Sequence, residues 1–350
     1  MPELWELRQM QSLPLAAKVR MTENRIRDWV REFGEDGVYV SFSGGKDSTV
    51  ILHIVRNLYP DVEAVFVNTG LEYPEIQMFV KTFENVTILS PKMRFDEVIK
   101  KYGYPIISKE VSKQIYEVNA CSVRNRCDKR ETPTYKRKFN VDSDYCKKYP
   151  RFSMGKYKRL LDVDFGISHK CCDVMKKNPA KDFEKTYGKK PIVATMASES
   201  RLRQTQWLNR GCNVFYSKRQ ISAPMSFWTE QDVLQYIKEN NIPIASVYGD
   251  IVSRDSDGYE YYDELVQGCK LYTTGCNRTG CIFCAFGCHI EKEPSRFQRL
   301  KKTHPRQYEY CIGGGEYDDD GIWKPNKQGL GMGHVFDELN KLYGDGFIKY

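Results

Sequence analysis

Hydrophobic residues along this chain alternate between two patterns, one typical of buried strands and one typical of amphipathic helices. Short runs rich in β-branched and aromatic residues, which favour strands, occur at 38–42, 62–67, 86–89 and 191–195. Apolar residues at helical spacing occur over 49–58, from about 74, over 172–187 and 198–208, and after Thr229, a suitable N-cap. Strands joined through helices form parallel sheets with right-handed crossovers and helices on both faces. The pattern therefore predicts an α/β fold with a doubly wound, Rossmann-like parallel sheet.

The rest of the chain follows this pattern less closely. Residues 1–36 have the spacing of a helical segment, and 37–240 hold the predicted α/β domain. Within that domain, 120–165 is polar, basic and aromatic without a clear period, which indicates an insertion. Residues 241–350 are rich in Gly, Cys, Tyr and Asp, with one helix expected over 295–310. We therefore expect one α/β domain between a helical segment and a cysteine-rich C-terminal region.

The net charge of +8 lies almost wholly in the insertion. Residues 121–160 contain 13 Lys and Arg against four acids, so this stretch carries +9 and the remaining 310 residues sum to −1. Aromatic residues alternate with the cations, and cations for phosphates together with rings for base stacking are typical of proteins that bind single-stranded or looped nucleic acid. The cations expected to form this nucleic-acid patch are Arg124, Arg126, Lys136, Arg137, Lys138, Lys147 and Lys148. A solvated excursion or a dock for an acidic protein partner is the alternative.

Composition and hydropathy exclude several classes of protein. With 41% hydrophobic and 29% charged residues over 350 positions, the chain is globular rather than disordered or fibrous. No stretch approaches the roughly 18 to 20 consecutive apolar residues that cross a bilayer. The first residues, MPELWELRQM, lack the apolar core of a secretion signal. We therefore expect a cytoplasmic protein without a membrane partner.

A glycine loop lies between the first predicted strand and the helix after it, formed by Ser43, Gly44, Gly45, Lys46, Asp47 and Ser48. At such a place the backbone N–H groups and the helix dipole attract an anion. The glycines let the backbone approach phosphate oxygens, Lys46 adds a mobile positive charge, and Asp47 is placed to hold Mg²⁺. The spacing differs from the Walker pattern GxxxxGK[ST]. The loop therefore predicts a phosphate site, with an ordinary strand-to-helix turn as the alternative.

Twelve cysteines in a protein expected in the reducing cytosol favour metal or sulfur chemistry over disulfides. Two are adjacent, Cys171 and Cys172. Four more lie within thirteen residues at the spacing C-x4-C-x2-C-x3-C, namely Cys276, Cys281, Cys284 and Cys288. Thiolates at such spacing bind structural zinc or an iron–sulfur cluster. Buried thiols without a metal are the remaining alternative.

The loop and its flanking elements closely resemble the PP-loop of the ATP pyrophosphatase (adenine nucleotide alpha-hydrolase-like) superfamily. Further segments narrow the resemblance to the phosphoadenosine phosphosulfate (PAPS) reductase family, in its iron–sulfur-bearing branch. They occur in the family's order, as NTGLEYPE at 68–75, KCC at 170–172 followed by Lys176 and Pro179, ATMASESRLR at 194–203, PMSFWTEQDVLQY at 224–236, and GCIFC at 280–284.

The resemblance implies roles for the matching residues. An adenine nucleotide, ATP or PAPS, would bind at the loop with Mg²⁺, and further contacts would come from Thr69, Gly70, Glu72, Glu199, Ser200 and Arg203. Most of these residues follow the ends of predicted strands, where open α/β sheets bind ligands. The alternative for Gly70 and Glu72 is a plain turn, and for Glu199, Ser200 and Arg203 it is the capped start of a helix. A 4Fe–4S cluster, or alternatively zinc, would be held by Cys171, Cys172, Cys281 and Cys284, with Cys276 and Cys288 as further candidate ligands. The expected catalytic residues are Lys46, Asp47 and Cys171.

Some positions distinguish this sequence from the sulfonucleotide reductases of that family. The glycine and arginine of the family's GxR segment are Ala194 and Met196 here, and no cysteine follows Cys311, where those reductases carry a catalytic one. The loop keeps its lysine, as the ATP-splitting relatives do. These differences favour ATP-dependent sulfur insertion into a nucleic acid, tRNA or DNA, with AMP and pyrophosphate as products and a sulfur-donor protein as partner.

Two other functions remain as alternatives. One is a PAPS or adenosine phosphosulfate reductase that forms sulfite with a thiol reductant protein. The other is a non-catalytic, cluster-bearing nucleotide-binding regulator or DNA-defence component.

Overall fold

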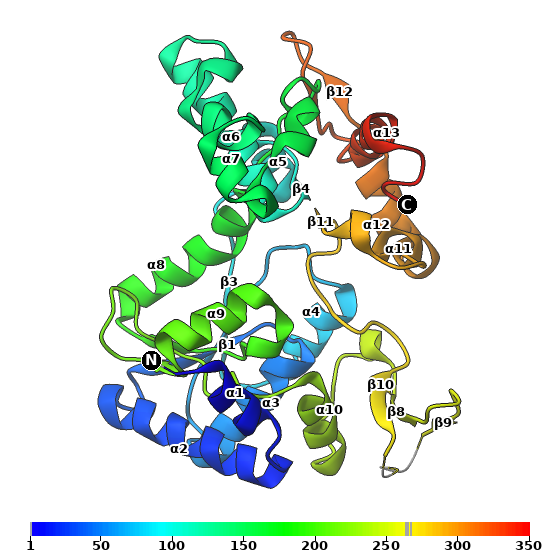
Figure 1. Cartoon of the computed structure of the whole chain (residues 1–350). Coiled ribbons are helices and arrows are strands. Elements are labelled where there is room, and N and C mark those ends of the chain that lie inside the picture. The colour runs from blue at the N-terminus through cyan, green and yellow to red at the C-terminus, as the bar shows by residue number, and fades with distance from the viewer. Residues whose placement is uncertain (1, 263–265, 267) are drawn as a thin grey trace. The chain divides into compact units, whose positions relative to one another are not determined.

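The computed structural model describes residues 2–262, 266 and 268–350, and the chain divides into two compact units (Figure 1). The first, the sheet unit, comprises the chain up to Asn68, Glu72–Ser90 and Pro179–Gly280. The second, the cysteine unit, comprises Thr69–Leu71, Pro91–Asn178 and Cys281–Tyr350. These units cross the boundaries expected from the sequence, because two segments that are far apart along the chain make up most of the cysteine unit.

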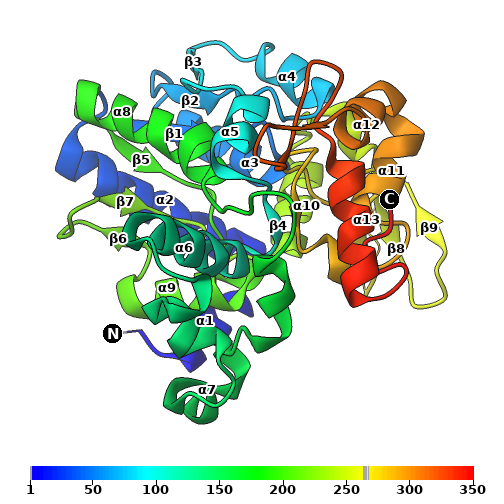
Figure 2. The same ribbon diagram turned by 90° about the horizontal axis from the view of Figure 1, so that it is seen from above.

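A six-stranded sheet forms the centre of the sheet unit. Its strands follow in the order β3-β2-β1-β5-β7-β6 (Figure 2). Their bounds are β1 Val38–Phe42, β2 Ala64–Val67, β3 Val86–Leu89, β5 Lys190–Ile192, β6 Asn213–Val214 and β7 Ile221–Ser222. Every neighbouring pair is parallel except β6 with β7. The predicted doubly wound parallel sheet is confirmed, with the difference that β6 runs antiparallel to its neighbour β7.

Helices cover this sheet on both faces, as its buried central strand requires. On one face, three helices pack on one another and on the sheet. They are α2 (Leu15–Phe33), α3 (Lys46–Leu58) and α10 (Glu230–Glu239). On the other face, Tyr39 of β1 packs edge-on against Phe183 of α8 (Asn178–Tyr187), with ring centroids 5.2 Å apart. Figure 1 shows α2 and α3 on one side of the strands and α8 on the other.

A buried ion pair fastens α2 to the start of α10. Lys18 Nζ lies 2.7 Å from Asp232 Oδ1, and the two side chains are only 3% and 10% exposed. Asp232 also accepts a hydrogen bond from the backbone N–H of Thr229, the N-cap of α10 (2.7 Å). In addition, Trp228 Nε1 donates to Thr22 Oγ1 at 2.9 Å. The first turn of α10 is therefore held in place by Lys18 and Thr22 of α2.

Smaller elements complete the sheet unit. They are α1 Leu4–Gln11, α4 Pro74–Val80, α9 Arg201–Arg210 and a three-stranded sheet of β8 Ile251–Arg254, β9 Glu260–Tyr261 and β10 Lys270–Thr273. Gln231 of α10 fastens this small sheet, because its side chain donates to Leu271 O (2.9 Å) and accepts from Leu271 N (2.7 Å). The segment that follows β10 is thereby brought to the start of α10.

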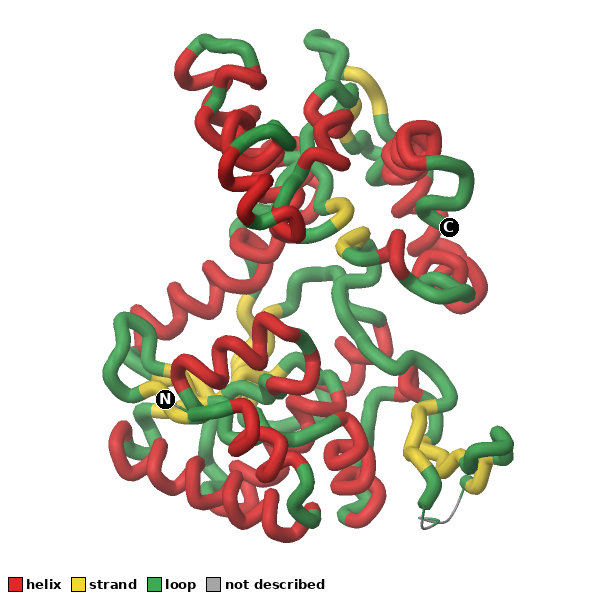
Figure 3. Tube along the Cα trace, in the orientation of Figure 1, coloured by secondary structure: helices red, strands yellow, loops and turns green. Residues whose placement is uncertain are grey.

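The cysteine unit is mostly helical (Figure 3). Its principal elements are α5 Phe95–Tyr102, β4 Ile106–Ile107, α6 Lys109–Asn125, α7 Asp144–Lys148, β11 Ala285–Phe286, α11 Arg296–Thr303, α12 Pro305–Ile312, β12 Glu316–Tyr317, β13 Trp323–Lys324 and α13 Met332–Tyr343. The pair β4 and β11 is parallel, and β12 forms a hairpin with β13. Among the described residues, no helix combines the length and the apolarity that a bilayer span requires.

Two regions of the cysteine unit differ from the expected local structure. The insertion begins inside α6 and continues as helical turns at Lys129–Glu131, Tyr135–Phe139, Asp144–Lys148 and Gly155–Leu161. The helix expected over 295–310 is two helices, because Pro305 has no backbone N–H to continue α11 and instead begins α12. Both regions are therefore more finely divided than the sequence pattern suggested.

Candidate functional site

The glycine loop at 43–48 joins the carboxyl end of β1 to the first turn of α3. Gly44 has a φ of +69°, and a Cβ atom at this position would lie 2.8 Å from both Ile76 and Val80 of α4. The left-handed backbone and the close approach of α4 both require glycine here. The loop therefore keeps a tight form that ends at the N-terminus of α3, where an anion would be attracted.

The serine hydroxyls of the loop bond to the loop itself. Ser48 Oγ accepts a hydrogen bond from the backbone N–H of Ser43 (3.1 Å) and donates to Gly45 O (2.8 Å). The two hydroxyl oxygens, Ser43 Oγ and Ser48 Oγ, are 3.0 Å apart. These bonds hold the loop in one shape before any ligand arrives.

Lys46, expected beside the phosphates, is buried and bonded within the protein. Its side chain is 5% exposed, and its Nζ lies 2.5 Å from Oε1 of Glu230 in the first turn of α10. The same Nζ donates to the carbonyl oxygen of Asn277 at 2.7 Å. A phosphate oxygen that approached Lys46 would therefore compete with a carboxylate and a carbonyl.

Two hydroxyl side chains from the later part of the sheet unit lie against the loop. The backbone N–H of Lys46 donates to Tyr248 Oη at 3.3 Å, and that oxygen is 2.5 Å from Thr279 Oγ1. The sequence analysis did not identify Glu230, Tyr248, Asn277 or Thr279 as part of this site. Only Glu230 carried a local signal, because it follows the predicted N-cap of α10; the others come from segments without a recognisable motif.

Asp47 has a buried oxygen that no group satisfies. Within the described part of the chain, its Oδ1 is buried and has no hydrogen-bond partner. Desolvation, with smaller contributions from Glu199 and Glu230, raises the pKa of Asp47 to about 6, although Lys46 and Arg278 oppose the rise. Mg²⁺ binds through one or two carboxylates together with substrate phosphates. A buried, unpartnered carboxylate oxygen beside a phosphate-type loop fits that chemistry.

The residues after β5 that were expected to contact the nucleotide form hydrogen bonds and an ion pair mainly with one another. Ser200 Oγ accepts from Arg203 N (3.3 Å) and caps α9, while Arg203 pairs with Glu199 (3.2 Å) and donates to Thr195 Oγ1 (2.8 Å). Glu199 in turn accepts from the backbone N–H of Met196 (2.9 Å). Because Glu199 contributes to the raised pKa of Asp47, this cluster lies within electrostatic reach of the loop.

The residues after β2 that were expected to contact the nucleotide are divided between the two units. Thr69 and Gly70 belong to the cysteine unit and Glu72 to the sheet unit. Thr69 and Glu72 are buried, and Thr69 Oγ1 accepts from the backbone N–H of Leu71 at 3.2 Å. Gly70 has a φ of +71° with open space where a Cβ atom would lie, so only its backbone requires glycine.

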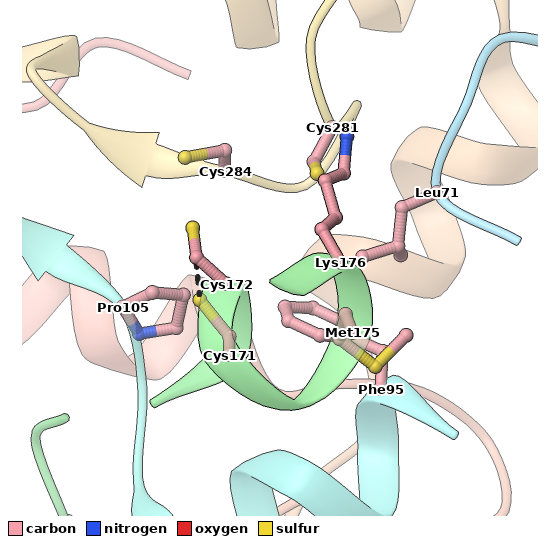
Figure 4. A pocket seen from close by; sticks show the side chains of 9 residues that line it. All are labelled: Leu71, Phe95, Pro105, Cys171, Cys172, Met175, Lys176, Cys281 and Cys284. Carbon is pink, nitrogen blue, oxygen red and sulfur yellow. Dashed lines mark hydrogen bonds between the residues drawn. The ribbon is translucent and has the colours of Figure 1, made fainter. Parts of the chain in front are cut away.

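Four of the predicted cysteines line one pocket of the cysteine unit, with a cavity of about 20 Å³ (Figure 4). Cys171 and Cys172 enter from the start of a helical turn, and Cys281 and Cys284 from the segment before β11. The rest of the wall consists of Leu71, Phe95, Pro105, Met175 and Lys176. The backbone N–H of Ile282 donates to Leu71 O at 2.8 Å, and this bond fixes the segment that carries the second cysteine pair.

The adjacent cysteines have opposite ionisation tendencies. The sulfur atoms of Cys171 and Cys172 are 4.0 Å apart. The thiol of Cys171 and the positive charges of Lys109 and Lys176 lower the pKa of Cys172 to about 6 despite its burial. The same hydrogen bond, together with burial, raises the pKa of Cys171. A thiolate at Cys172 beside a thiol at Cys171 is therefore the favoured state of the pair.

The four thiols match the ligand chemistry of the expected metals. Cysteine sulfurs are the usual ligands of iron–sulfur clusters and of structural zinc. In the described part of the chain, no three His, Cys, Asp or Glu side chains lie close enough together to coordinate a metal ion. The four sulfur atoms would therefore have to move closer to one another to bind a metal. The donor set fits either metal, and its spacing would have to adjust on binding.

The two further candidate ligands, Cys276 and Cys288, are not among the residues that line this pocket. Cys276 belongs to the sheet unit, whereas the four pocket cysteines belong to the cysteine unit. Cys288 is buried outside the pocket wall, and its thiol donates to Ala285 O at 3.0 Å. Burial raises the pKa of Cys288 to about 12. The structure thus brings together the cysteines that the family resemblance indicated, rather than the run with C-x4-C-x2-C-x3-C spacing.

The cations of the expected nucleic-acid patch are mostly exposed. Lys138 is the exception, because its side chain is 18% exposed and pairs with Glu110 at 3.0 Å. The guanidinium of Arg137 lies 4.5 Å from the ring centroid of Tyr145. The exposed cations are Arg124, Arg126, Lys136, Arg137, Lys147 and Lys148. Cations and aromatic rings are therefore interleaved in space as well as in sequence.

Comparison with known proteins links most of the sheet unit and part of the cysteine unit to one family. The family described as phosphoadenosine phosphosulfate reductase domain matches residues 37–129 and 111–254. An uncharacterized protein of Methanocaldococcus jannaschii is 38% identical over 73 residues, which is 19% of this chain and 18% of that protein. A phosphoadenosine 5'-phosphosulfate reductase of Xylella fastidiosa is 33% identical over 82 residues, which is 23% of this chain and 34% of that protein. The chain thus spans about a third or less of the length of these curated relatives.

One solved structure is similar at low identity. It is a phosphoadenylyl-sulfate reductase of Candida auris in a phosphate complex, with 15% sequence identity and a TM-score of 0.36. The alignment covers 70% of this chain and 91% of that chain.

Proposed function

The chain belongs to the phosphoadenosine phosphosulfate reductase family, and on that premise we propose that it is an ATP-dependent enzyme that inserts sulfur into a nucleic acid. The observation that carries the proposal is the buried carboxylate of Asp47, which follows Lys46 in the first turn of α3. Among the residues that the structure describes, Asp47 Oδ1 has no hydrogen-bond partner, and the neighbouring residue Lys46 is buried at the same helix N-terminus. Mg²⁺ at Asp47 and phosphates at the loop would satisfy both the unpartnered oxygen and the helix dipole.

Position 196 supports ATP over a sulfonucleotide. Sulfonucleotide reductases of the family have an arginine there, and this chain has Met196, which is 2% exposed. A buried methionine supplies no cation for a sulfate group. The loop lysine, which the ATP-splitting relatives share, remains available for the triphosphate once it exchanges Glu230 for a phosphate oxygen.

The proposed reaction has two steps. An oxygen of the nucleic-acid base attacks the α-phosphorus of ATP, the bond to the β-phosphate breaks, and pyrophosphate leaves. Sulfide-level sulfur then forms a bond to the activated carbon, and AMP departs with the original oxygen, so no net oxidation or reduction takes place. Lys46 and the backbone N–H groups of the loop would stabilise the negative charge that develops on the phosphates.

The cysteine pocket is the proposed place of sulfur delivery. Cys172 is the thiolate of the adjacent pair, and Lys109 and Lys176 hold its negative charge. Cys171, Cys172, Cys281 and Cys284 would hold a 4Fe–4S cluster, which would supply a metal site for sulfide once one of these four thiolates is displaced. The raised pKa of Cys171 keeps this thiol protonated in the metal-free pocket, and metal binding would release that proton.

A second candidate function is reduction of PAPS to sulfite. The reductase name of the Xylella fastidiosa relative favours it. In that reaction two thiols are oxidised to a disulfide while the sulfur of the sulfonucleotide is reduced and leaves as sulfite. Cys171 and Cys172, with sulfurs 4.0 Å apart, or an external thiol protein would supply the electrons.

One set of incubations separates these functions. Purified protein receives labelled ATP or labelled PAPS, with and without sulfide, dithiol reductant and bulk tRNA or DNA. Pyrophosphate and AMP that depend on nucleic acid support sulfur insertion, and sulfite from PAPS supports reduction and overturns the first proposal. Nucleotide binding without any turnover would leave a regulator as the function. Lys46→Ala should abolish whichever turnover is observed, with Lys185→Ala on α8 as the matched control.

A further inference from the structure

A second cavity lies in the insertion, away from the cysteine pocket. Its volume is about 160 Å³, and the charged and aromatic residues of its wall are Lys129, Arg130, Tyr135, Lys158, Arg159 and Asp162. None of these residues was part of the expected nucleic-acid patch. The wall carries four cations and one carboxylate, so its net charge is +3.

The wall is built from two segments about thirty residues apart along the chain. Lys129 Nζ donates to the carbonyl oxygen of Leu161, and Arg130 lies 3.2 Å from Asp162. Asp128 caps the short turn that carries Lys129 and Arg130, since its Oδ1 accepts from Arg130 N at 2.7 Å. These contacts join the segments and hold the cavity in shape without a ligand.

Three of the four cations of the wall have no wall carboxylate to offset their charge, because the single carboxylate, Asp162, pairs with Arg130. Asp162 offsets Arg130, and the hydrogen bond of Arg159 goes to the carbonyl of Leu342 (3.3 Å), which neutralises no charge. Lys158 and Arg159 are both exposed to solvent at the cavity. Like charges gathered around one space favour a bound anion.

The surroundings indicate which anion it is. The ring of Tyr135 stacks on Phe139, with centroids 5.9 Å apart and planes at 4°, so its orientation is fixed. Nearby along the insertion, Tyr149 and Phe152 are 43% and 57% exposed, which leaves their rings open for stacking on bases. An acidic peptide would need no such rings.

We propose that this cavity binds a backbone phosphate of a single-stranded or looped nucleic acid and so anchors the strand on the insertion. The inference rests on the proposed function, because it specifies how the nucleic-acid substrate is held. A space of about 160 Å³ is similar to engineered cavities that hold a small organic molecule, and it suits one phosphate group with its hydration. Lys158 and Arg159 would contact the phosphate oxygens directly.

The test is a titration of the full chain against a fluorescent single-stranded RNA at several salt concentrations. Lys158→Ala/Arg159→Ala removes two cations of the cavity. Lys301→Ala/Lys302→Ala, on the exposed last turn of α11, removes the same charge from the same unit. We expect the cavity variant to bind about tenfold more weakly and to lower the slope of log K against log salt by about 0.7, the amount for one lost phosphate contact on a single strand. The α11 variant should change affinity by less than about twofold.

A charge-conserving variant, a stability measurement and a competitor complete the experiment. Lys158→Arg/Arg159→Lys keeps the charges and should retain binding, and equal unfolding midpoints show that the variants are folded. Equal losses in the cavity and α11 variants, or no loss in the cavity variant, overturn the inference. Displacement of the RNA by polyglutamate at equal charge concentration would identify an acidic protein partner instead and also overturn it.

The same measurements separate this inference from the proposed function. If the wild type binds RNA and the cavity variant binds equally well, only the anchoring site is wrong. If the cavity variant alone loses binding but no pyrophosphate forms from ATP, the site stands and the proposed reaction is wrong. If the wild type binds no nucleic acid, both are overturned.

Discussion

Lys46 Nζ lies 2.5 Å from Glu230 Oε1, so the lysine of the phosphate-type loop is already neutralised by a carboxylate from α10. The pair is asymmetric, because the Lys46 side chain is 5% exposed while the Glu230 side chain is 44% exposed. Glu230 can therefore turn to solvent at little cost when a phosphate arrives, whereas Lys46 cannot. The contact holds the loop lysine in position and makes nucleotide binding a competition with Glu230.

Glu230→Gln should tighten nucleotide binding. The amide keeps a hydrogen-bond acceptor for Lys46 but removes the charge that opposes the phosphates. Because Glu230 is partly exposed, we expect a gain of about 1.5-fold to 5-fold, equivalent to the roughly 0.2 to 1 kcal/mol of an exposed ion pair. Titration with a fluorescent ATP analogue measures the change, and Glu239→Gln at the other end of α10 is the matched control. Weaker binding in Glu230→Gln would show instead that the carboxylate contributes to the nucleotide site.

Asp47→Asn should stabilise the nucleotide-free protein and impair Mg²⁺-dependent ATP binding. The folded-state pKa of Asp47, about 6, lies above the ordinary value of 3.8. Its contribution to stability is therefore fully present below about pH 4 and is lost as pH rises through about 6. Above pH 6 the variant should exceed the wild type by up to about 3 kcal/mol, the equivalent of a shift of roughly two pKa units.

Urea unfolding without Mg²⁺, from pH 4 to pH 8, measures this difference. The free energies of unfolding of wild type and variant should converge at the acid end and separate above pH 6. Asp61→Asn, in the loop before β2, serves as the control. Parallel curves for wild type and Asp47→Asn would contradict the buried, unsatisfied state of this carboxylate.

Much of the sheet could be predicted from the sequence, because its strands are short β-branched runs between turn residues. The strands Val38–Phe42 and Val86–Leu89 have the predicted bounds. Helix α6 was not predicted. Val111, Ile115 and Val118 are buried at helical spacing after the N-cap Ser108, yet the insertion was expected to start in the middle of this helix. The basic and aromatic composition of the following residues concealed a regular local pattern.

The candidate site could be predicted only in its local parts. The loop could be predicted because its six residues are consecutive and their types together suit a phosphate site. Tyr248 and Asn277 contact the loop although they lie about two hundred residues away along the chain. No local sequence pattern indicates such contacts. The cysteine pocket is intermediate, since the family resemblance selected the four cysteines that the fold brings together and spacing alone favoured another set.

Lys18→Met should destabilise the sheet unit by about 3 to 5 kcal/mol, because it leaves the charge of Asp232 buried without its partner. Lys18→Met/Asp232→Asn should recover much of the loss, since the amide oxygen can still accept the N–H of Thr229. Urea unfolding measures both variants, and Lys177→Met, which breaks an exposed pair with Asp173, is the control. A double variant as unstable as the single one would mean that the methionine itself is not accommodated at position 18.

Removal of single pocket cysteines should abolish metal binding, whereas removal of Cys288 should not. Cys281 and Cys284 line the pocket with the adjacent pair, but Cys288 bonds to Ala285 O outside its wall. After anaerobic reconstitution we expect about four iron atoms per wild-type chain with visible charge-transfer absorption. Cys281→Ser and Cys284→Ser should lose both signals.

The comparison with Cys288→Ser decides between the two cysteine sets. If the cluster were held by the C-x4-C-x2-C-x3-C run, Cys288→Ser would lose iron as completely as Cys281→Ser. In the arrangement described above it retains iron, as should Cys121→Ser, whose sulfur accepts from Asn125 Nδ2 at 3.3 Å in α6. A colourless wild-type protein with one zinc per chain would contradict the iron–sulfur cluster while leaving the same four ligands in place.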